Sequence, residues 1–132
     1  MYYCFSYFGS LIIYISSLGT NAALKDFSNV TTKSLGQNGY YKFPDGLLIQ
    51  WGQRAGSSTS GVSVYLPVSF YDTNYIVLGS IVKSNSDAIA YSATPLLNPA
   101  KSSFIMDRNF SSTGGSGIST GAFNWIAIGR WK

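Results

Sequence analysis

The sequence contains no histidine and no glutamate, and cysteine occurs once, at Cys4. Without histidine, Ser-His-Asp and Cys-His nucleophilic catalysis and histidine metal sites are excluded. A single cysteine cannot form an internal disulfide or a thiolate metal cage. We therefore predict no catalytic residue, no metal site and no cofactor in this chain.

Charge is scarce as well, because charged residues make up only 11% of the chain, against about a quarter in an average protein. Good helix formers are also few, whereas aromatic residues reach 16%, with 10 Tyr, 8 Phe and 3 Trp. Aromatic and β-branched side chains favour strands. With 45% hydrophobic residues and a net charge of +4, the chain can bury a core. Its 132 residues predict one β-rich domain, alone or with a tail.

The positive net charge raises the question of a nucleic-acid partner. Such partners require several cations focused in one stripe, so that they displace counterions from neighbouring phosphates. Here the cations are scattered singly along the sequence, and we predict no nucleic-acid binding. They are Lys25, Lys33, Lys42, Arg54, Lys83, Lys101, Arg108, Arg130 and Lys132.

Residues 1–24 carry no charge, and residues 2–18 are almost wholly apolar or aromatic. Four interpretations stay open for this segment. The first is a signal peptide without the usual basic start, which would export the protein to the bacterial envelope. The second is a membrane anchor interrupted by Ser6, Gly9 and Ser10. The third is sequence read through from an early start or joined to a truncated gene, and the fourth is an ordinary β segment. Residues 25–38 are polar and predict a spacer.

From residue 39 onward, short apolar runs alternate with turn residues. Pro44, Asp45 and Gly46 predict a tight turn, because proline fixes φ and glycine accepts positive φ. The Gly/Ser/Thr-rich stretch 109–121 predicts a loop. Six or seven short strands at even spacing are typical of an antiparallel sandwich or barrel. The expected strands are 40–43, 47–51, 62–66, 75–83, 88–94, 103–108 and 122–130.

Three kinds of side chain are candidates for a function or for the core. The aspartates are far apart in sequence, and Asp45, Asp72 and Asp87 fit turns better than an acid/base pair. A polysaccharide depolymerase that uses two aspartates remains a minor alternative. Trp51 and Trp125 lie in apolar strands and are predicted to pack in the core. Aromatic residues beside polar loops are the better candidates for stacking on sugars, namely Tyr71, Tyr75 and Phe110.

Two segments carry a resemblance to a known family. The first is GYYKFPDGLLIQWG at residues 39–52, and the second is WIAIGRW at residues 125–131, at the chain end. They match the "G-Y-x-x-(L/F)-P-x-G-(L/I)-x-(I/L)-Q-W-G" opening and the "W-x-A-I-G" ending of the C-terminal tip domain of phage and prophage tail fibres. Residues 39–132 therefore resemble that domain.

The resemblance implies an all-β fold, a small antiparallel β-sandwich that is intertwined or packed as a homotrimer. It also implies a non-enzymatic function at the tip of a virion tail fibre. There the domain would bind a bacterial surface receptor, either a glycan such as lipopolysaccharide or capsule, or an outer-membrane protein. The motif residues map to structural positions, namely Pro44, Gly46, Trp51, Trp125 and Gly129.

Receptor contacts in such tips lie in variable loops, so they do not transfer by motif. From polarity and turn position we predict Arg54, Tyr71, Asp72, Asn74, Asn85, Asp87, Arg108, Asn109 and Phe110 as contact residues. Multivalency would raise the affinity of weak single contacts. The alternative from another class is a secreted or membrane-anchored lectin-like module, with residues 1–24 as its export signal.

Overall fold

The computed structural model describes residues 27–29, 31–84 and 86–132, and residue contacts divide the chain into Met1–Val30 and Thr31–Lys132. The predictions for residues 1–24 lie outside the described residues. In the second unit the described chain forms strands and no helix. The strands are β1 (Thr32–Ser34), β2 (Gly39–Lys42), β3 (Leu47–Arg54), β4 (Gly61–Tyr65), β5 (Ile76–Ile81), β6 (Ala90–Pro95), β7 (Ser103–Ser112), β8 (Gly115–Ile118) and β9 (Phe123–Arg130).

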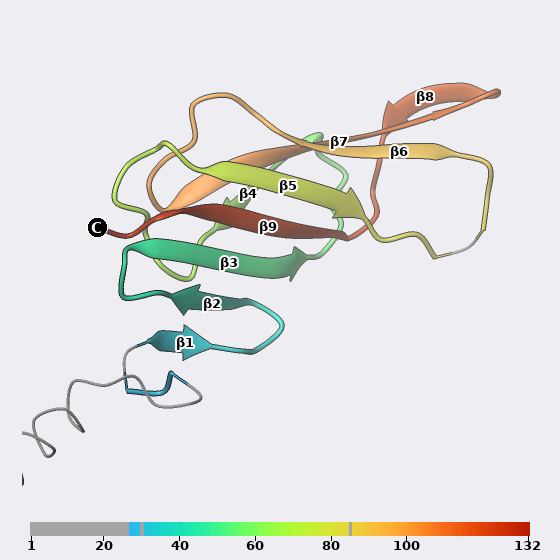
Figure 1. Ribbon diagram of the computed structural model, residues 1–132. Coiled ribbons are helices and arrows are strands. Elements are labelled where there is room, and N and C mark those ends of the chain that lie inside the picture. The colour runs from blue at the N-terminus through green and yellow to red at the C-terminus, as the bar shows by residue number, and fades with distance from the viewer. Residues whose placement is uncertain (1–26, 30, 85) are drawn as a thin grey trace, which may run out of the picture. The chain divides into compact units, whose positions relative to one another are not determined.

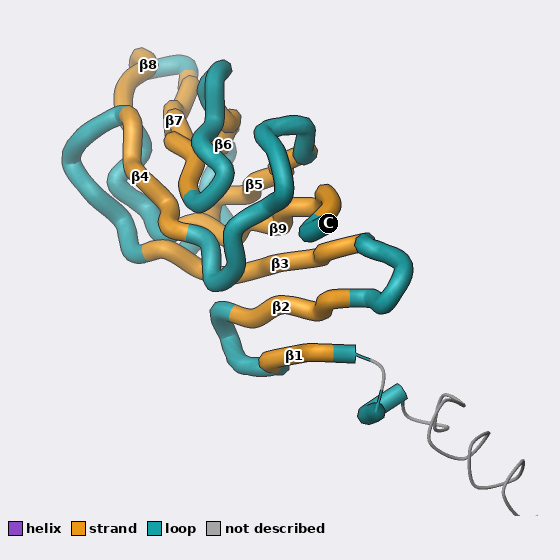
Figure 2. The backbone as a smooth tube through the Cα atoms, turned by 90° about the vertical axis from the view of Figure 1, so that its left-hand side faces the viewer, coloured by secondary structure: helices purple, strands orange, loops and turns teal. Residues whose placement is uncertain are grey.

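The strands form two antiparallel sheets (Figure 1). Sheet A has the order β1-β2-β3-β9-β5, and sheet B has the order β4-β7-β6, with β8 paired to β7. Figure 2 shows β1 and β2 extending past the edge of sheet B. The prediction of an all-β antiparallel fold is confirmed.

The core lies between the two sheets and follows the two-residue period of strand side chains. In β4, Val62 and Val64 are buried while their neighbours are exposed, and β9 buries Phe123, Trp125 and Ala127 in the same alternation. The full buried cluster is Leu48, Val62, Val64, Phe70, Val77, Phe104, Met106, Phe123, Trp125 and Ala127.

A buried glutamine connects sheet A to the loop that follows β4. The Gln50 side chain is fully buried, its Nε2 donates to the Val68 carbonyl at 2.8 Å, and its Oε1 accepts from the Val68 amide at 2.8 Å. The amide thus pairs with the Val68 backbone as a neighbouring strand would, and both of its polar atoms are satisfied. This pairing explains a polar residue in the middle of the apolar run 47–51.

The predicted turn at Pro44–Gly46 is present, and Gly46 has a φ of 107°. The Phe43 amide donates to the Leu47 carbonyl at 2.9 Å and closes the turn. The last aromatic residue covers it, because Trp131 Nε1 donates to the Phe43 carbonyl at 2.8 Å and the Trp131 amide donates to the Gly46 carbonyl at 2.9 Å. The two segments that carry the family resemblance, residues 39–52 and 125–131, therefore meet in space.

Three sequence-based expectations about the fold differ from the structure, and two of them concern secondary structure. The stretch 109–121 is not a continuous loop, because β7 runs on to Ser112 and pairs with β8. Backbone hydrogen bonding to a neighbouring strand outweighs the low strand preference of glycine and serine there. The segment 25–38, expected as a spacer, contains β1, which pairs with β2.

Trp51 is the third difference, because it is not part of the core. It lies on the outer face of sheet A, half-buried, opposite Gly39 of β2. Its Nε1 donates to the Gly36 carbonyl at 3.1 Å. A Cβ at Gly39 would lie only 2.6 Å from the Trp51 ring, so the ring covers the bare glycine backbone. Successive side chains of a strand point to opposite faces of the sheet, so Trp51 lies on the face away from the buried Leu48 and Gln50.

Candidate functional site

The strands of sheet A end at two opposite sides of the domain. Leu47 pairs with Arg130 at one side, and Arg54 pairs with Phe123 at the other. We name the first side the carboxyl end, because the chain terminates there, and the second the far end (Figure 1). The loop 66–75 lies at the carboxyl end, and the loops 55–60, 82–89, 113–114 and 119–122 lie at the far end.

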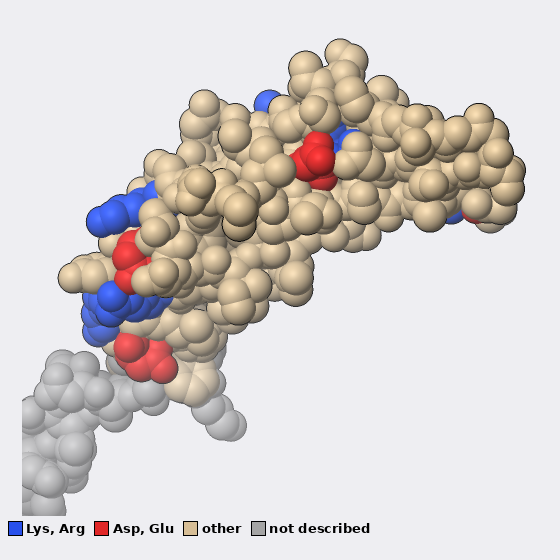
Figure 3. All heavy atoms as spheres, turned by 90° about the horizontal axis from the view of Figure 1, so that it is seen from above, with Lys and Arg blue, Asp and Glu red and all other residues tan. Residues whose placement is uncertain are grey.

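The predicted contact residues of the loop 66–75 are engaged with one another at the carboxyl end. Arg130 donates to Asp72 Oδ2 from Nε at 2.9 Å and from Nη2 at 2.6 Å, and its guanidinium lies 4.4 Å from the Tyr71 ring centroid. The Asn74 amide donates to Asp72 Oδ1 at 2.9 Å. The hydrogen bonds from Arg130 lower the pKa of the Asp72 carboxyl below its ordinary value. In the view of Figure 3 the Lys and Arg side chains gather mostly at one end of the domain.

Arg108 was predicted as a receptor contact, and the structure contradicts this prediction because its side chain is fully buried. Continued alternation along β7 points Phe104, Met106 and Arg108 inward. Its guanidinium donates to three backbone carbonyls of far-end loops: Gly121 at 2.9 Å, Ser57 at 2.9 Å and Thr59 at 2.7 Å. Arg108 thus holds two far-end loops together from inside.

Arg108 carries a second unusual feature. Its Nε is buried and has no hydrogen-bond partner among the described residues. Burial lowers the pKa of the guanidinium, but the group stays charged at any ordinary pH. The Phe123 ring lies 5.5 Å from the guanidinium carbon. Burying a guanidinium away from water raises the free energy of the folded state, and the hydrogen bonds to the three carbonyls are the main compensation for Arg108.

The remaining predicted contacts occupy different places. Arg54 is exposed at the end of β3, and Asn109 is exposed in β7. Asp87 and Phe110 lie at the far end, whereas Asn85 lies outside the described residues. The predicted contacts therefore divide between two opposite ends, and they do not form one site.

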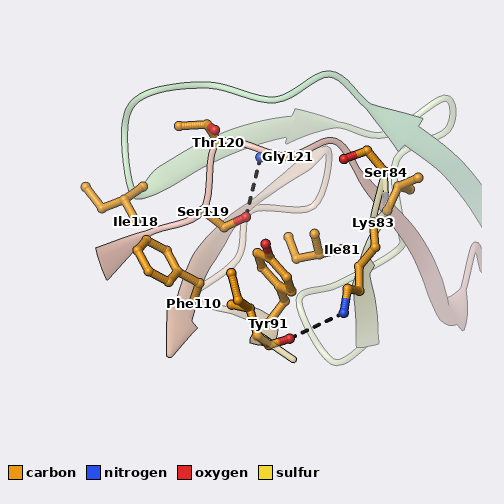
Figure 4. Close-up of a pocket in the computed structure, with 11 residues that line it drawn as sticks. Ile81, Lys83, Ser84, Tyr91, Phe110, Ile118, Ser119, Thr120 and Gly121 are labelled. Atoms are coloured by element: carbon orange, nitrogen blue, oxygen red, sulfur yellow. Dashed lines mark hydrogen bonds between the residues drawn. The ribbon is translucent and has the colours of Figure 1, made fainter. Parts of the chain in front are cut away.

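A pocket of about 280 Å³ opens at the far end. Its walls come from the β5–β6 loop, from β6, β7 and β8, and from the β8–β9 loop. Figure 4 shows the Tyr91 ring between Phe110 on one side and Lys83 on the other. The lining residues are Ile81, Val82, Lys83, Ser84, Ile89, Tyr91, Phe110, Ile118, Ser119, Thr120 and Gly121.

The two aromatic rings of the pocket are held in place by their neighbours. Tyr91 and Phe110 face each other across β6 and β7 with ring centroids 6.5 Å apart and planes tilted by 48°. On β8, Gly117 pairs with Phe110, and a Cβ at Gly117 would lie 3.1 Å from its ring. Glycine at this position lets the β8 backbone support the Phe110 ring.

Lys83 and Asp87 form an ion pair on the rim of the pocket. Lys83 Nζ lies 2.7 Å from Asp87 Oδ1 and donates to the Asp87 carbonyl at 2.8 Å and to the Ile89 carbonyl at 3.5 Å. Asp87 also accepts from the Ile89 amide at 3.3 Å and from the Tyr91 hydroxyl at 3.3 Å. The hydrogen bond from Lys83 lowers the pKa of the Asp87 carboxyl, so the pair is charged but neutral in sum at neutral pH.

The outer face of sheet A is a second candidate surface, and it is apolar. Strand register forms two apolar rows across this face. One row is Ile49, Ile128 and Ile76, and the other is Trp51, Ile126 and Leu78. Ile76 is 67% exposed and Leu78 is 62% exposed. A third row is polar, with Gln53 Nε2 donating to Asn124 Oδ1 at 3.0 Å. Contiguous exposed apolar residues of this kind mark interaction surfaces.

Among the described residues, no cluster of three metal-ligating side chains occurs. The same residues include no helix of the length and hydropathy needed to cross a membrane.

Comparison with known families identifies the domain. A family model for the C-terminal part of gp53-like tail fibre proteins matches residues 42–130. The chain belongs to this family. The tail fibre domain thus has its place in the tail fibre of a virion, and the tail fibre is favoured over the lectin-like alternative. No curated protein matches its sequence.

Solved structures show the same fold in other tail fibres. The domain superposes on an N-truncated R2-type pyocin tail fibre with a TM-score of 0.60 and 20% identity, over 76% of this chain and 37% of that chain. A C-terminal R2 pyocin fibre fragment from P. aeruginosa gives 0.60 and 20%, over 76% and 26%. An N-truncated R1-type pyocin tail fibre gives 0.53 and 14%, over 76% and 85%. The tail fibre domain spans about a third of the first two chains or less.

Sequence reasoning missed the pocket and the apolar face. The pocket depends on the β7–β8 hairpin, where the Gly/Ser/Thr-rich sequence predicts a loop, so the sequence gives no sign that Ile118 and Ser119 line a pocket. The apolar face did have a signal, because β9 alternates Phe123, Trp125 and Ala127 with Ile126 and Ile128. A strand that is apolar on both faces indicates that both faces of its sheet pack against other protein surfaces.

Proposed function

We propose that the tail fibre domain is the distal, receptor-binding part of its fibre and attaches the particle to a bacterial surface. The observation that carries the proposal is the family match together with the arrangement of the ends. β1 begins at the carboxyl end, because Thr32, Lys42, Leu48 and Gly129 follow one another across the sheet register. The first and last strands of the described domain therefore have their outer ends on one side, and the far-end loops, on the opposite side, are where we place the receptor.

The receptor is a surface glycan or an outer-membrane protein, and three copies of the chain act together. The apolar rows on the outer face of sheet A support assembly, because Ile76 and Leu78 are too exposed for a surface that stays in water. Packing this face against sister chains would bury both rows. Three far ends on one particle would then convert weak single contacts into firm attachment.

The domain binds its receptor and does not hydrolyse it. Asp72 and Asp87 lie at opposite ends of the domain, and each is held in an ion pair. Asp45 lies at the carboxyl end with Asp72, but its Oδ1 accepts from the Leu47 amide, and Asp107 Oδ2 accepts from Asn109 Nδ2. Glycoside hydrolysis needs two carboxyl groups that are free to act on one cleft, and carboxylates engaged in these contacts support a binding role.

Binding to intact cells tests the proposal. The full chain, labelled with a fluorophore, is incubated with a panel of bacterial strains, and its mass in solution is measured by light scattering. We expect saturable binding to a subset of strains, a mass of three chains, and no release of sugar from the cells. Absence of binding to every strain would contradict receptor binding, and a monomer at all concentrations would contradict the trimer.

A further inference from the structure

We propose that the far-end pocket binds one uncharged pyranose ring of a surface glycan, stacked on Tyr91 and Phe110. This inference rests on the proposed receptor-binding function and gives that function a site and a ligand class. It concerns the pocket alone and does not depend on the apolar face of sheet A.

The size of the pocket sets the size of the ligand. Its volume of about 280 Å³ is just below the roughly 300–1,000 Å³ found for small-molecule sites. Such a space takes a single ring, whereas a peptide loop needs a longer groove. The ligand is therefore one residue of a larger surface polymer, and the rest of the polymer stays outside.

The chemistry of the walls fits a sugar ring. The face of a pyranose ring presents C–H groups, which pack against aromatic rings such as those of Tyr91 and Phe110. The edge of the ring presents hydroxyl groups, and Ser84, Ser119 and Thr120 supply hydroxyls along the same pocket. Ser119 is buried at the wall of the pocket, and its Oγ accepts from the Gly121 amide at 3.4 Å, which fixes the position of this hydroxyl.

The charge on the rim selects an uncharged sugar. An ammonium group has three N–H donors, and Lys83 Nζ has three acceptors: Asp87 Oδ1, the Asp87 carbonyl and the Ile89 carbonyl. An anionic group would have to break this arrangement and would meet the Asp87 carboxylate. Although the whole chain carries +4, the pocket itself offers no free positive charge.

Ligand-observed saturation-transfer NMR on the full chain tests the inference. The probes are galactose, glucose and N-acetylglucosamine as uncharged rings, and N-acetylneuraminic acid and inorganic phosphate as anions. We expect transfer to at least one uncharged sugar and at least tenfold weaker binding of the anions. Transfer to no uncharged sugar, or equal binding of an anion, would overturn the inference.

Two matched substitutions locate the binding. Ser84→Trp fills the pocket from its exposed rim, and Ser69→Trp adds the same bulk to an exposed residue at the carboxyl end. Neither serine is buried, so both variants should fold, which an amide NMR spectrum checks. We expect Ser84→Trp to lose at least tenfold in sugar affinity and Ser69→Trp to retain it. Equal affinities for the two variants would overturn the inference.

The cell-binding experiment separates this inference from the function on which it rests. If cells are bound equally by Ser84→Trp and by the unchanged chain, the pocket is not the receptor site, but receptor binding stands. If protease treatment of the cells abolishes binding and no sugar shows transfer, the receptor is a protein and the inference is overturned. If no cells are bound at all, the proposed function itself fails.

Discussion

The ring of Trp125 on β9 lies against Gly52 on β3, its direct partner in the antiparallel register. A Cβ at Gly52 would lie 2.7 Å from the Trp125 ring and would also meet Asn38 Oδ1. Asn38 Oδ1 in turn accepts from the Gln53 amide at 2.9 Å. The bare backbone at Gly52 therefore lets the β1–β2 turn and the core tryptophan approach β3 together.

Gly52→Ala should lower the free energy of unfolding by about 1–3 kcal/mol, because overpacking forces the ring or the strand to move. Urea unfolding measures the loss. Gly114→Ala is the matched control, since Gly114 is exposed in the β7–β8 turn and a Cβ there would meet no atom closer than 3.9 Å. Equal stability of the two variants would show that the Trp125 ring does not depend on the glycine.

Arg108→Met should destabilise the protein by about 1–3 kcal/mol, because three backbone carbonyls lose the charged donor that binds them. It should also loosen the far-end loops, since those carbonyls belong to Ser57, Thr59 and Gly121. Urea unfolding and hydrogen exchange of residues 55–60 and 119–122 measure the two effects. Arg54→Met, at an exposed position, should change stability by less than about 0.5 kcal/mol. Unchanged exchange in the Arg108 variant would contradict the anchoring role.

Acid should weaken the fold through its two ion-paired aspartates. The pKa values of Asp72 and Asp87 are lowered in the folded state, so their stabilisation is complete above the unfolded pKa of about 3.9 and is lost as the pH falls through the folded values. We expect the melting temperature to fall below about pH 4. The Asp72→Asn, Asp87→Asn double variant should show a shallower fall, and an identical slope would contradict this account.

Alkali should act through Tyr75. Its hydroxyl donates to the Ala100 carbonyl at 2.8 Å and lies 3.0 Å from the Ser103 carbonyl, and burial raises its pKa to about 12. A raised pKa gives stability that is complete below the ordinary value of 10.0 and is lost as the pH rises toward 12. Tyr75→Phe should be less stable at neutral pH but lose less stability between these values. Tyr65→Phe, at a 79% exposed position, should follow the unchanged protein.

The apolar face of sheet A should hold the assembly together. Leu78→Lys puts a charge at the β5 end of the Trp51–Ile126–Leu78 row, and burying an unpaired ammonium is strongly unfavourable. We expect this variant to be a folded monomer by analytical ultracentrifugation. Leu97→Lys is the matched control, because Leu97 is 92% exposed in the β6–β7 loop. If both variants keep the same mass as the unchanged chain, this face is not the interface.

Local chemistry made part of the structure predictable. The turn at Pro44–Gly46 follows from residues that fix their own backbone angles, and the alternation in β4 follows from its burial on one face. Long-range pairing was not predictable in the same way. β8 is rich in glycine and serine and forms only because β7 offers a partner. Arg108 lies within the expected strand 103–108, and its alternation with Phe104 and Met106 points its side chain inward.

The division of the predicted contacts has the same origin. Tyr71 and Phe110 both look like loop aromatics in the sequence, yet sheet topology sends them to opposite ends. Only the fold shows that the family motif residues act in pairs. Trp51 covers Gly39 on the outer face, and Trp131 covers the turn at Gly46. The motif residues therefore belong to the structural scaffold, and the proposed receptor site depends on loops outside the motif.

The most direct test of the account is hydrogen exchange of the full chain with and without outer-membrane vesicles from a strain that it binds. The account predicts new protection in the far-end loops, at residues 82–89 and 113–122, with none in the carboxyl-end loop at residues 66–75. Protection confined to residues 66–75, or absent from the far end, would contradict the claim that this end of the tail fibre domain meets the receptor.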